Sequence, residues 1–350
     1  MKIKGTFHGD PRAEKLLNVA LKGIREEIAV SSMAKSIRAV VLGGSYGRGE
    51  GGATPDGALC NDLDFFIVVP HFAPRRKIAA LFHEIGKKWS ATLNIDVDFA
   101  FPQTLDDFER KASTLMVKDL LMAHLVIFGD PNCFTDITRC PWEDLPFFEG
   151  MRLLLNRGTG ILLAEQRLQL NTGNIKDQEF IERNLHKAAL GCGDALLIAR
   201  HALLGSGIER QIKLDELEMP PKLCSAYSEA LEYKYCPTYG DLEKLLSWLT
   251  SSKKLFFETV ETFFALTADP WPLNSRAHYA RANFRDRKKT FSERLRNFIL
   301  NMLYLRKLPN PLLVTVAPQM KIFAMLIDSL KNTTDDDLHK RYLELWQRFN

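Results

Sequence analysis

Hydrophobic and polar residues follow two different periods in the first third of the chain. Apolar residues recur at helical spacing in residues 11–33, and again in residues 74–89, whose remaining positions are largely basic. Short apolar or alternating segments separate these helices and predict strands at residues 37–42, 65–69 and 93–101. Residues 105–130 predict a helix followed by a short strand that ends at Gly129-Asp130. Helices and short strands in this order indicate an α+β domain.

The pattern changes near residue 133 and is helical for the rest of the chain. Residues 133–148 contain Pro141, Trp142 and Pro146, which predicts a linker between domains. Beyond it no segment has a convincing strand period, and helices are expected at residues 150–170, 177–204, 222–235, 239–250, 253–267, 276–307, 317–331 and 335–349. We therefore expect an α+β domain over residues 1–135 and an all-helical domain over residues 149–350, with an acceptor-binding or lid role for the second.

The strongest chemical signal follows the first predicted strand. Asp62 and Asp64 stand at the head of the apolar run that continues to Val69. Residues i and i+2 of a strand project from the same face, so the two carboxylates would lie side by side while Leu63 and Phe65 turn into the core. Adjacent like charges repel each other unless a cation lies between them. Hard oxygen ligands of this kind suit Mg²⁺ or Mn²⁺ rather than zinc.

The glycine-rich turn before these aspartates supplies donors for a phosphate. Gly43 and Gly44 let backbone amides approach an oxyanion without a Cβ in the way. Ser45 adds a hydroxyl, and Arg48 adds a guanidinium whose geometry matches phosphate oxygens. Together with the two carboxylates, this turn indicates a nucleotide held through its phosphates. The alternative is a surface turn followed by two solvated aspartates, which requires all these features to coincide by chance.

The alternating segment at residues 93–101 can add a further carboxylate. Its apolar residues share one face of the expected strand, and Asp96 and Asp98 share the other. If this strand pairs beside the one that carries Asp62 and Asp64, one of its aspartates would join them. Three carboxylates can hold the two metal ions of a phosphoryl-transfer site. Without such a neighbour, the segment would be an amphipathic edge strand with its polar face in solvent.

Composition limits the classes of protein to which this chain can belong. The 350 residues are 46% hydrophobic and 26% charged, and the net charge of +4 suits anionic substrates but is too small to argue for nucleic acid. The six cysteines contain no C-x-x-C pair, which favours a reducing compartment and disfavours a zinc cluster. No apolar run reaches the length of a membrane span, and no secretion signal is evident. We therefore expect a cytoplasmic protein with no membrane partner.

The segments GGSYGRGE, NDLDFFIVV and IDVDFAF together resemble the nucleotidyltransferase superfamily that includes DNA polymerase beta, poly(A) polymerases and kanamycin nucleotidyltransferase. Its members combine an apolar strand, Gly-Ser, an Asp-x-Asp strand and a later strand with a third Asp. The short form Gly-Ser-x-x-Arg-Gly is similar to the smaller bacterial members, which modify small molecules or proteins. The resemblance covers roughly residues 35–130. It departs from the family in the sixteen residues between Ser45 and Asp62, a longer spacer than usual.

This resemblance implies a short mixed sheet with flanking helices and assigns roles to individual residues. Asp62 and Asp64 would be catalytic and would bind the metal ions. Asp96 would be the third aspartate, because Ile95-Asp96-Val97 keeps the apolar-Asp-apolar order of the family, with Asp98 as the other choice. The triphosphate would be held by Gly43, Gly44, Ser45 and Arg48.

Two segments of the helical half admit a structural and a functional interpretation. Gly191 and Gly193 interrupt a strong helix; close helix packing is the simpler account, whereas Arg183 or Lys187 could reach the triphosphate from the same segment. Residues 276–296 are rich in basic side chains, which favours a solvated helix face over an anion-binding surface.

These features lead us to expect a Mg²⁺-dependent nucleotidyltransferase. It would move a nucleoside monophosphate from a nucleoside triphosphate, with ATP favoured, to an acceptor and release pyrophosphate. A small molecule is the favoured acceptor, a protein side chain comes next, and RNA comes third. The alternative is a catalytically silent protein that binds nucleotide as a regulator, or binds a partner chain as an antitoxin does.

Overall fold

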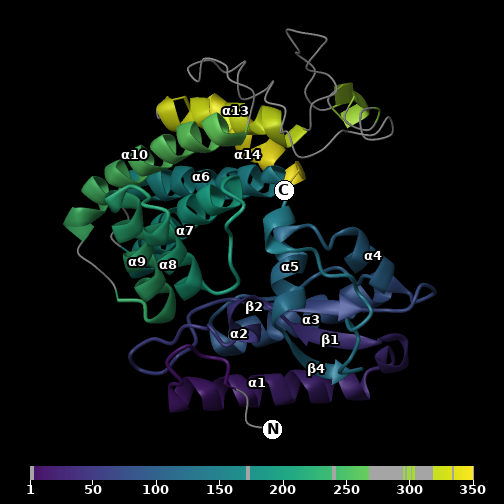
Figure 1. Cartoon of the computed structure of the whole chain (residues 1–350). Helices are drawn as coiled ribbons and strands as arrows, with labels where there is room; N and C mark the ends of the chain where they lie inside the picture. Colours follow the sequence, from purple (N-terminus) through teal and green to yellow (C-terminus); the bar gives the residue numbers. More distant parts are fainter. Residues whose placement is uncertain are drawn as a thin grey trace. The chain divides into compact units, whose positions relative to one another are not determined.

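Two units share the chain, and each has its own core. The computed structural model describes residues 4–170, 174–238, 242–267, 295, 298–300, 302–303, 318–332 and 335–349. Unit 1 consists of Met1–Leu145 together with Leu231–Thr238, and unit 2 consists of Pro146–Ala230 and Tyr239–Asn350. Unit 1 contains a β-sheet with flanking helices, whereas every element described in unit 2 is a helix (Figure 1).

The sheet of unit 1 has four short strands in the order β3-β2-β1-β4. Strand β1 pairs antiparallel with β2 and with β4, and β2 pairs parallel with β3, so the sheet is mixed, as the sequence predicts. Both faces are buried, which explains why β1 and β2 have continuous apolar sequences instead of alternating ones. The strand bounds are β1 (Ala39–Leu42), β2 (Leu63–Val68), β3 (Val97–Phe99) and β4 (Leu125–Gly129).

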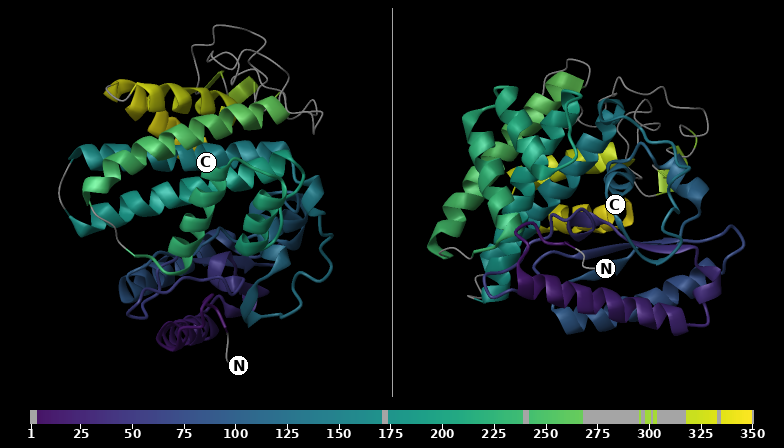
Figure 2. Two further views of the ribbon diagram at one scale, coloured as in Figure 1. Left: turned by 60° about the vertical axis from the view of Figure 1, so that its left-hand side comes forward. Right: turned by 60° about the horizontal axis from the view of Figure 1, so that its bottom comes forward.

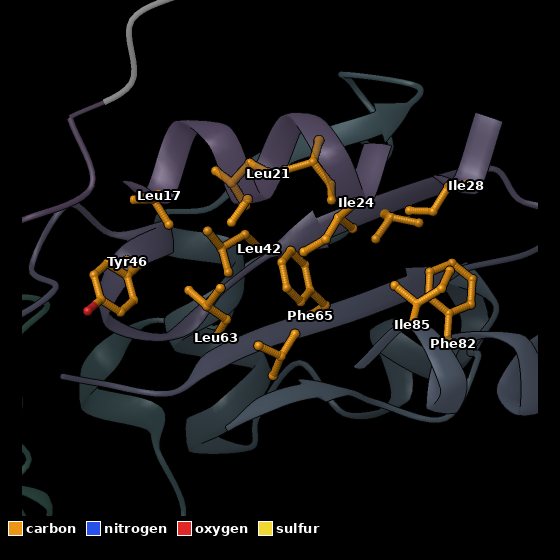
Figure 3. Packing of buried hydrophobic residues seen from close by; sticks show 14 of the residues in the cluster. Leu17, Leu21, Ile24, Ile28, Leu42, Tyr46, Leu63, Phe65, Phe82 and Ile85 are labelled. Carbon is orange, nitrogen blue, oxygen red and sulfur yellow. The ribbon is translucent and has the colours of Figure 1, made fainter. Parts of the chain in front are cut away.

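Helices cover both faces of this sheet. On one face lie α1 (Pro11–Val30) and α3 (Arg75–Leu93), which run side by side (Figure 2). Leu17, Leu21 and Ile24 of α1 pack there against strand residues such as Phe65 (Figure 3). On the other face lie α4 (Leu105–Arg110) and α5 (Leu115–Met122), which bury a second apolar cluster. The sheet is thus held between two cores, while strand residues such as Asp98 of β3 are exposed.

Three boundaries in unit 1 differ from the sequence prediction. Helix α3 continues to Leu93 and ends at Asn94, whose φ of 55° is left-handed, so β3 begins only at Val97. The helix expected after residue 105 is two helices, because the Thr114 hydroxyl caps a new one, α5. The expected linker over residues 133–148 begins as part of the core, since Cys133, Phe134 and Ile137 are buried there.

Unit 2 is built around long helices that pack closely. Helix α6 packs on α7, which also packs on α10. A Cβ on Gly191 would lie 2.4 Å from Cγ of Arg157 in α6, and a Cβ on Gly193 would lie 2.4 Å from the ring of Tyr227, so close packing is confirmed as the reason for these glycines. The helix bounds are α6 (Phe147–Leu170), α7 (Ile175–Ala199), α8 (Gly207–Glu216), α9 (Pro221–Tyr235), α10 (Leu242–Thr267), α13 (Pro318–Lys331) and α14 (Asp336–Phe349).

The helical prediction for unit 2 is wrong in two places. Residues 239–250 and 253–267 do not form separate helices, since α10 is continuous across the polar residues between them. The sequence pattern also missed α8, a short helix that begins with a capping box between Ser206 and Glu209. The basic segment 276–296 lies, except for Leu295, outside the described residues. Within the described part of the chain, no helix combines the length and the apolar character needed to cross a membrane.

Candidate functional site

Strand β1 ends in a tight turn that forms the short helix α2 (Gly44–Gly47). Gly44 has a φ of +60°, and a Cβ at this position would lie 2.3 Å from Oδ2 of Asp64. Glycine is therefore required both by the backbone conformation and by the carboxylate that lies against it. The amide of Gly43, expected to bind a phosphate, instead donates to the carbonyl of Asp64 at 2.8 Å. The donors left for a phosphate at this turn belong to the residues that follow Gly43.

The register between β2 and β3 decides which aspartates lie together. These parallel strands pair Asp64 with Asp98, and on the opposite face Phe65 stacks on Phe99 with ring centroids 4.6 Å apart. Asp96 precedes β3 and lies two positions before Asp98, at the level of Asp62. The sequence pattern favours Asp96 as the third carboxylate, but the register favours Asp98. The reason is that α3 extends to Leu93 and leaves only a short strand, which starts after Asp96.

The carboxylates at this edge of the sheet influence one another. Partial desolvation, followed by the negative charges of Asp96 and Asp62, raises the pKa of Asp98 above its ordinary value. Asp98 forms no hydrogen bond or ion pair through its side chain with any other residue in the described ranges. Across these ranges, no group of three or more His, Cys, Asp or Glu side chains is arranged so that it could hold a metal ion. The carboxylates are thus neighbours with mutual repulsion rather than a closed cluster.

Residues 27–126 match a family model described as a nucleotidyltransferase domain. The match covers β1, the turn at Gly43–Gly47, β2 and β3, which are the elements that carry the glycines and the aspartates. Unit 1 contains a nucleotidyltransferase domain. A search of curated proteins found no match to this chain. The family match agrees with the resemblance carried by the Gly-Ser turn and the Asp-x-Asp strand.

Arg48 of the nucleotidyltransferase domain is held by carboxylates. Its Nε lies 3.5 Å from Oε2 of Glu50, one of its terminal nitrogens lies 3.8 Å from Oδ2 of Asp119, and its side chain is only 13% exposed. Nζ of Lys234 lies 3.2 Å from the same oxygen of Glu50. Charges of alternating sign therefore link Lys234, Glu50, Arg48 and Asp119. The guanidinium that the sequence assigns to the triphosphate is engaged within the chain.

Tyr46 organises the nucleotidyltransferase domain's long spacer, and sequence reasoning missed it. Its hydroxyl donates to the carbonyl of Gly52 at 2.7 Å and accepts from the amides of Cys60 at 3.1 Å and Asn61 at 3.3 Å. The ring packs within the apolar cluster, and the hydroxyl is directed away from it (Figure 3). Burial raises the pKa of Tyr46, so the hydroxyl stays protonated and able to donate. The sequence feature that could have identified Tyr46 was its place as a single aromatic residue within a glycine-rich segment.

Proposed function

We propose that this protein transfers a nucleoside monophosphate from a nucleoside triphosphate, with ATP the favoured donor, to a nucleophile on a small molecule or a protein. In this reaction the acceptor attacks the α-phosphorus, the bond from that phosphorus to its bridging oxygen breaks, and pyrophosphate leaves. The observation that carries the proposal is the register that sets Asp64 beside Asp98, with Asp64 against the Gly44 turn. The nucleotidyltransferase domain at residues 27–126 supports the general reaction.

The donors at this edge of the sheet have the chemistry that suits a divalent cation, but no three of them are arranged as a metal site in the described residues, so a bound cation would have to draw them together. They are carboxylate oxygens, which Mg²⁺ and Mn²⁺ prefer. Partial desolvation and then the charges of Asp96 and Asp62 raise the pKa of Asp98, and a bound cation would oppose both effects. Asp62, Asp64 and Asp98 would hold the metal, and Asp96 would lie next to them. The cation would neutralise charge on the phosphates when the nucleotide is bound.

The remaining residues have binding and positioning roles. The amides after Gly43 would bind the outer phosphates, where hydrogen bonds from fixed donors favour charge that develops on the leaving pyrophosphate. The hydroxyl of Ser45, which donates to Oδ1 of Asn61 at 3.4 Å, would join them by turning its hydrogen from Asn61 to the phosphate. Arg48 lies at ion-pair distance from Glu50 and Asp119, and its buried Nε has no hydrogen-bond partner in the described residues, so we assign it to the electrostatic support of the turn. Exposed Asp96, which precedes β3, would take the proton that the acceptor loses.

Substitution of Asp64 tests this proposal. Asp64→Asn should reduce Mg²⁺-dependent pyrophosphate release from ATP at least about a hundredfold, because a metal-binding carboxylate contributes several kcal/mol to the transition state. Asp136→Asn, an exposed position outside the site, should leave the rate unchanged. Full activity of Asp64→Asn would overturn the assignment. Metal-independent binding of ATP, with no pyrophosphate from any acceptor, would instead support the nucleotide-binding regulator.

A further inference from the structure

A segment far along the chain belongs to unit 1. We call residues 231–238, which comprise the end of α9 and the residues after it, the returning segment. The carbonyl of Tyr235 accepts from the amide of Ala53 at 3.0 Å. A Cβ on Gly52 would lie 2.3 Å from the carbonyl oxygen of Lys234, so the returning segment lies directly against the spacer's backbone. The spacer between Ser45 and Asp62 is therefore closed by residues that the family match does not include.

The amino-terminal residues hold the returning segment from another direction. The ring of Phe7 stacks on that of Tyr235 with centroids 3.8 Å apart and planes 6° apart. The amide of Phe7 donates to the carbonyl of Gly51 at 2.8 Å, and Thr6 forms a bridge with the same glycine. Stacking of this kind contributes beyond the area that the two rings bury. The spacer near Gly51 thus contacts both the amino-terminal residues and the returning segment.

Asn61 connects the returning segment to the phosphate turn. Its Oδ1 accepts from the amide of Gly52 at 2.6 Å and from the hydroxyl of Ser45 at 3.4 Å, and its Nδ2 donates to the carbonyl of Lys234 at 3.4 Å. An amide side chain can accept through one atom and donate through the other, which neither aspartate nor leucine can do. The ion pair from Lys234 to Glu50 adds a second connection to the same turn.

We propose that the returning segment positions Ser45 for the triphosphate, with Asn61 and Lys234 as the positioning residues. This inference rests on the proposed function, because it assigns these residues to the same nucleotide site. A spacer of this length loses much conformational entropy when it becomes ordered, and contacts made before the nucleotide arrives remove that loss from binding. Nucleotide affinity should therefore depend on residues that do not contact the nucleotide.

The test compares nucleotide binding by Asn61→Leu and Lys234→Met in the full chain. Both substitutions should raise the Kd of a non-hydrolysable ATP analogue with Mn²⁺ about tenfold, measured by calorimetry, and should raise KM more than they lower kcat. Lys234→Arg should restore affinity to within about twofold, because it keeps the charge that pairs with Glu50. Asn132→Leu, at an exposed position outside this network, serves as the control. Unchanged affinity in folded Asn61→Leu would overturn the proposal.

A second measurement separates this proposal from the proposed function. Hydrogen exchange without nucleotide should be faster at the amides of Gly52 and Ala53 in Asn61→Leu and Lys234→Met than in the natural protein. If the natural protein binds no nucleotide, the proposed function fails. The hydrogen-exchange rates of Gly52 and Ala53 then test whether Asn61 and Lys234 position the spacer. Faster exchange would then support positioning of the spacer, and unchanged exchange would refute it.

Discussion

Asp98 in unit 1 and Asp194 in unit 2 are carboxylates in opposite settings. Partial desolvation raises the pKa of Asp98, and the negative charges of Asp96 and Asp62 raise it further. Asp194 is 9% exposed and accepts from Arg210 at 2.9 Å and from the hydroxyl of Tyr227 at 2.8 Å. Arg210 also donates to the carbonyls of Leu204 and Gly205, so its guanidinium is satisfied within unit 2.

Asp194 is a charge that supports the fold, whereas we propose that Asp98 is a charge that binds a cation. A buried charge pair stabilises the native chain only when both partners and their remaining hydrogen bonds are present, as they are at Asp194. Carboxylates crowded together oppose folding slightly, and they become useful when a cation from solution neutralises them. Substitutions at the two places should therefore have opposite consequences for stability.

The largest expected effect is at the Asp194 pair. Arg210→Met removes the guanidinium and leaves a nearly buried carboxylate without its main partner, so the free energy of unfolding in urea should fall by about 3 kcal/mol. Lys213→Met on the same helix is the matched control, because Lys213 pairs with the exposed Glu216 and such surface pairs contribute less than about 1 kcal/mol. Equal effects from the two substitutions would contradict the contrast between paired and crowded carboxylates.

The second effect should appear in catalysis and not in folding. Asp98→Asn removes one of several crowded charges, so the free energy of unfolding should stay the same or rise. Pyrophosphate release should fall about a hundredfold, because we propose that Asp98 holds the metal. Asp96→Asn should have the smaller effect on activity. If Asp96→Asn reduced activity more than Asp98→Asn in the same assay, Asp96 and not Asp98 would be the third carboxylate of the site.

A third and smaller effect concerns the buried hydroxyl of Tyr46. Tyr46→Phe leaves the carbonyl of Gly52 and the amides of Cys60 and Asn61 without their partner, which should lower the free energy of unfolding by about 2 kcal/mol. The amides of Cys60 and Asn61 should exchange faster with solvent. Exchange at the natural rate would mean that Tyr46 does not hold the spacer.

The smallest effect concerns His186, an interior group of unit 2. Burial lowers its pKa from 6.5 to about 4, and its ring lies edge-on to Trp248 at 4.5 Å between centroids. Below pH 6.5 the unfolded chain takes up a proton that the folded chain does not, so stability is lost as pH falls toward 4. Between pH 7.5 and 5.5 this loss should be about 1 kcal/mol. His186→Phe should weaken the pH dependence, and an identical dependence would contradict the assignment.

Local pattern was sufficient for strands β1 and β2 and for the glycine turn between them. Continuous apolar runs predict β1 and β2 because both faces of those strands are buried. The glycines and the Asp-x-Asp pair mark the strand ends because each residue type is restricted there, Gly44 by its backbone and by Asp64. These features depend on neighbours within a few residues, which is the range that a pattern can report.

Features that depend on distant contacts were not predictable. The register that sets Asp98 beside Asp64 follows the point where α3 stops, and Asn94 sets that point through a left-handed conformation that many residue types rarely adopt. Contacts of Asn61 with Lys234 join positions with no periodic relation in the sequence. The sequence pattern assigns Arg48 to the phosphates, and it could not show the carboxylates of Glu50 and Asp119, which lie near Arg48 in the folded chain.

Unit 1 is discontinuous along the chain, since it consists of Met1–Leu145 and the later segment Leu231–Thr238. Boundaries for recombinant expression that follow the family match, or that stop at residue 145, would omit the part that closes the spacer. Such a fragment would retain every aspartate at the strand ends and still present a poorly ordered Ser45 to the nucleotide. Weak activity of such a fragment would therefore reflect the missing residues and not the activity of the intact protein.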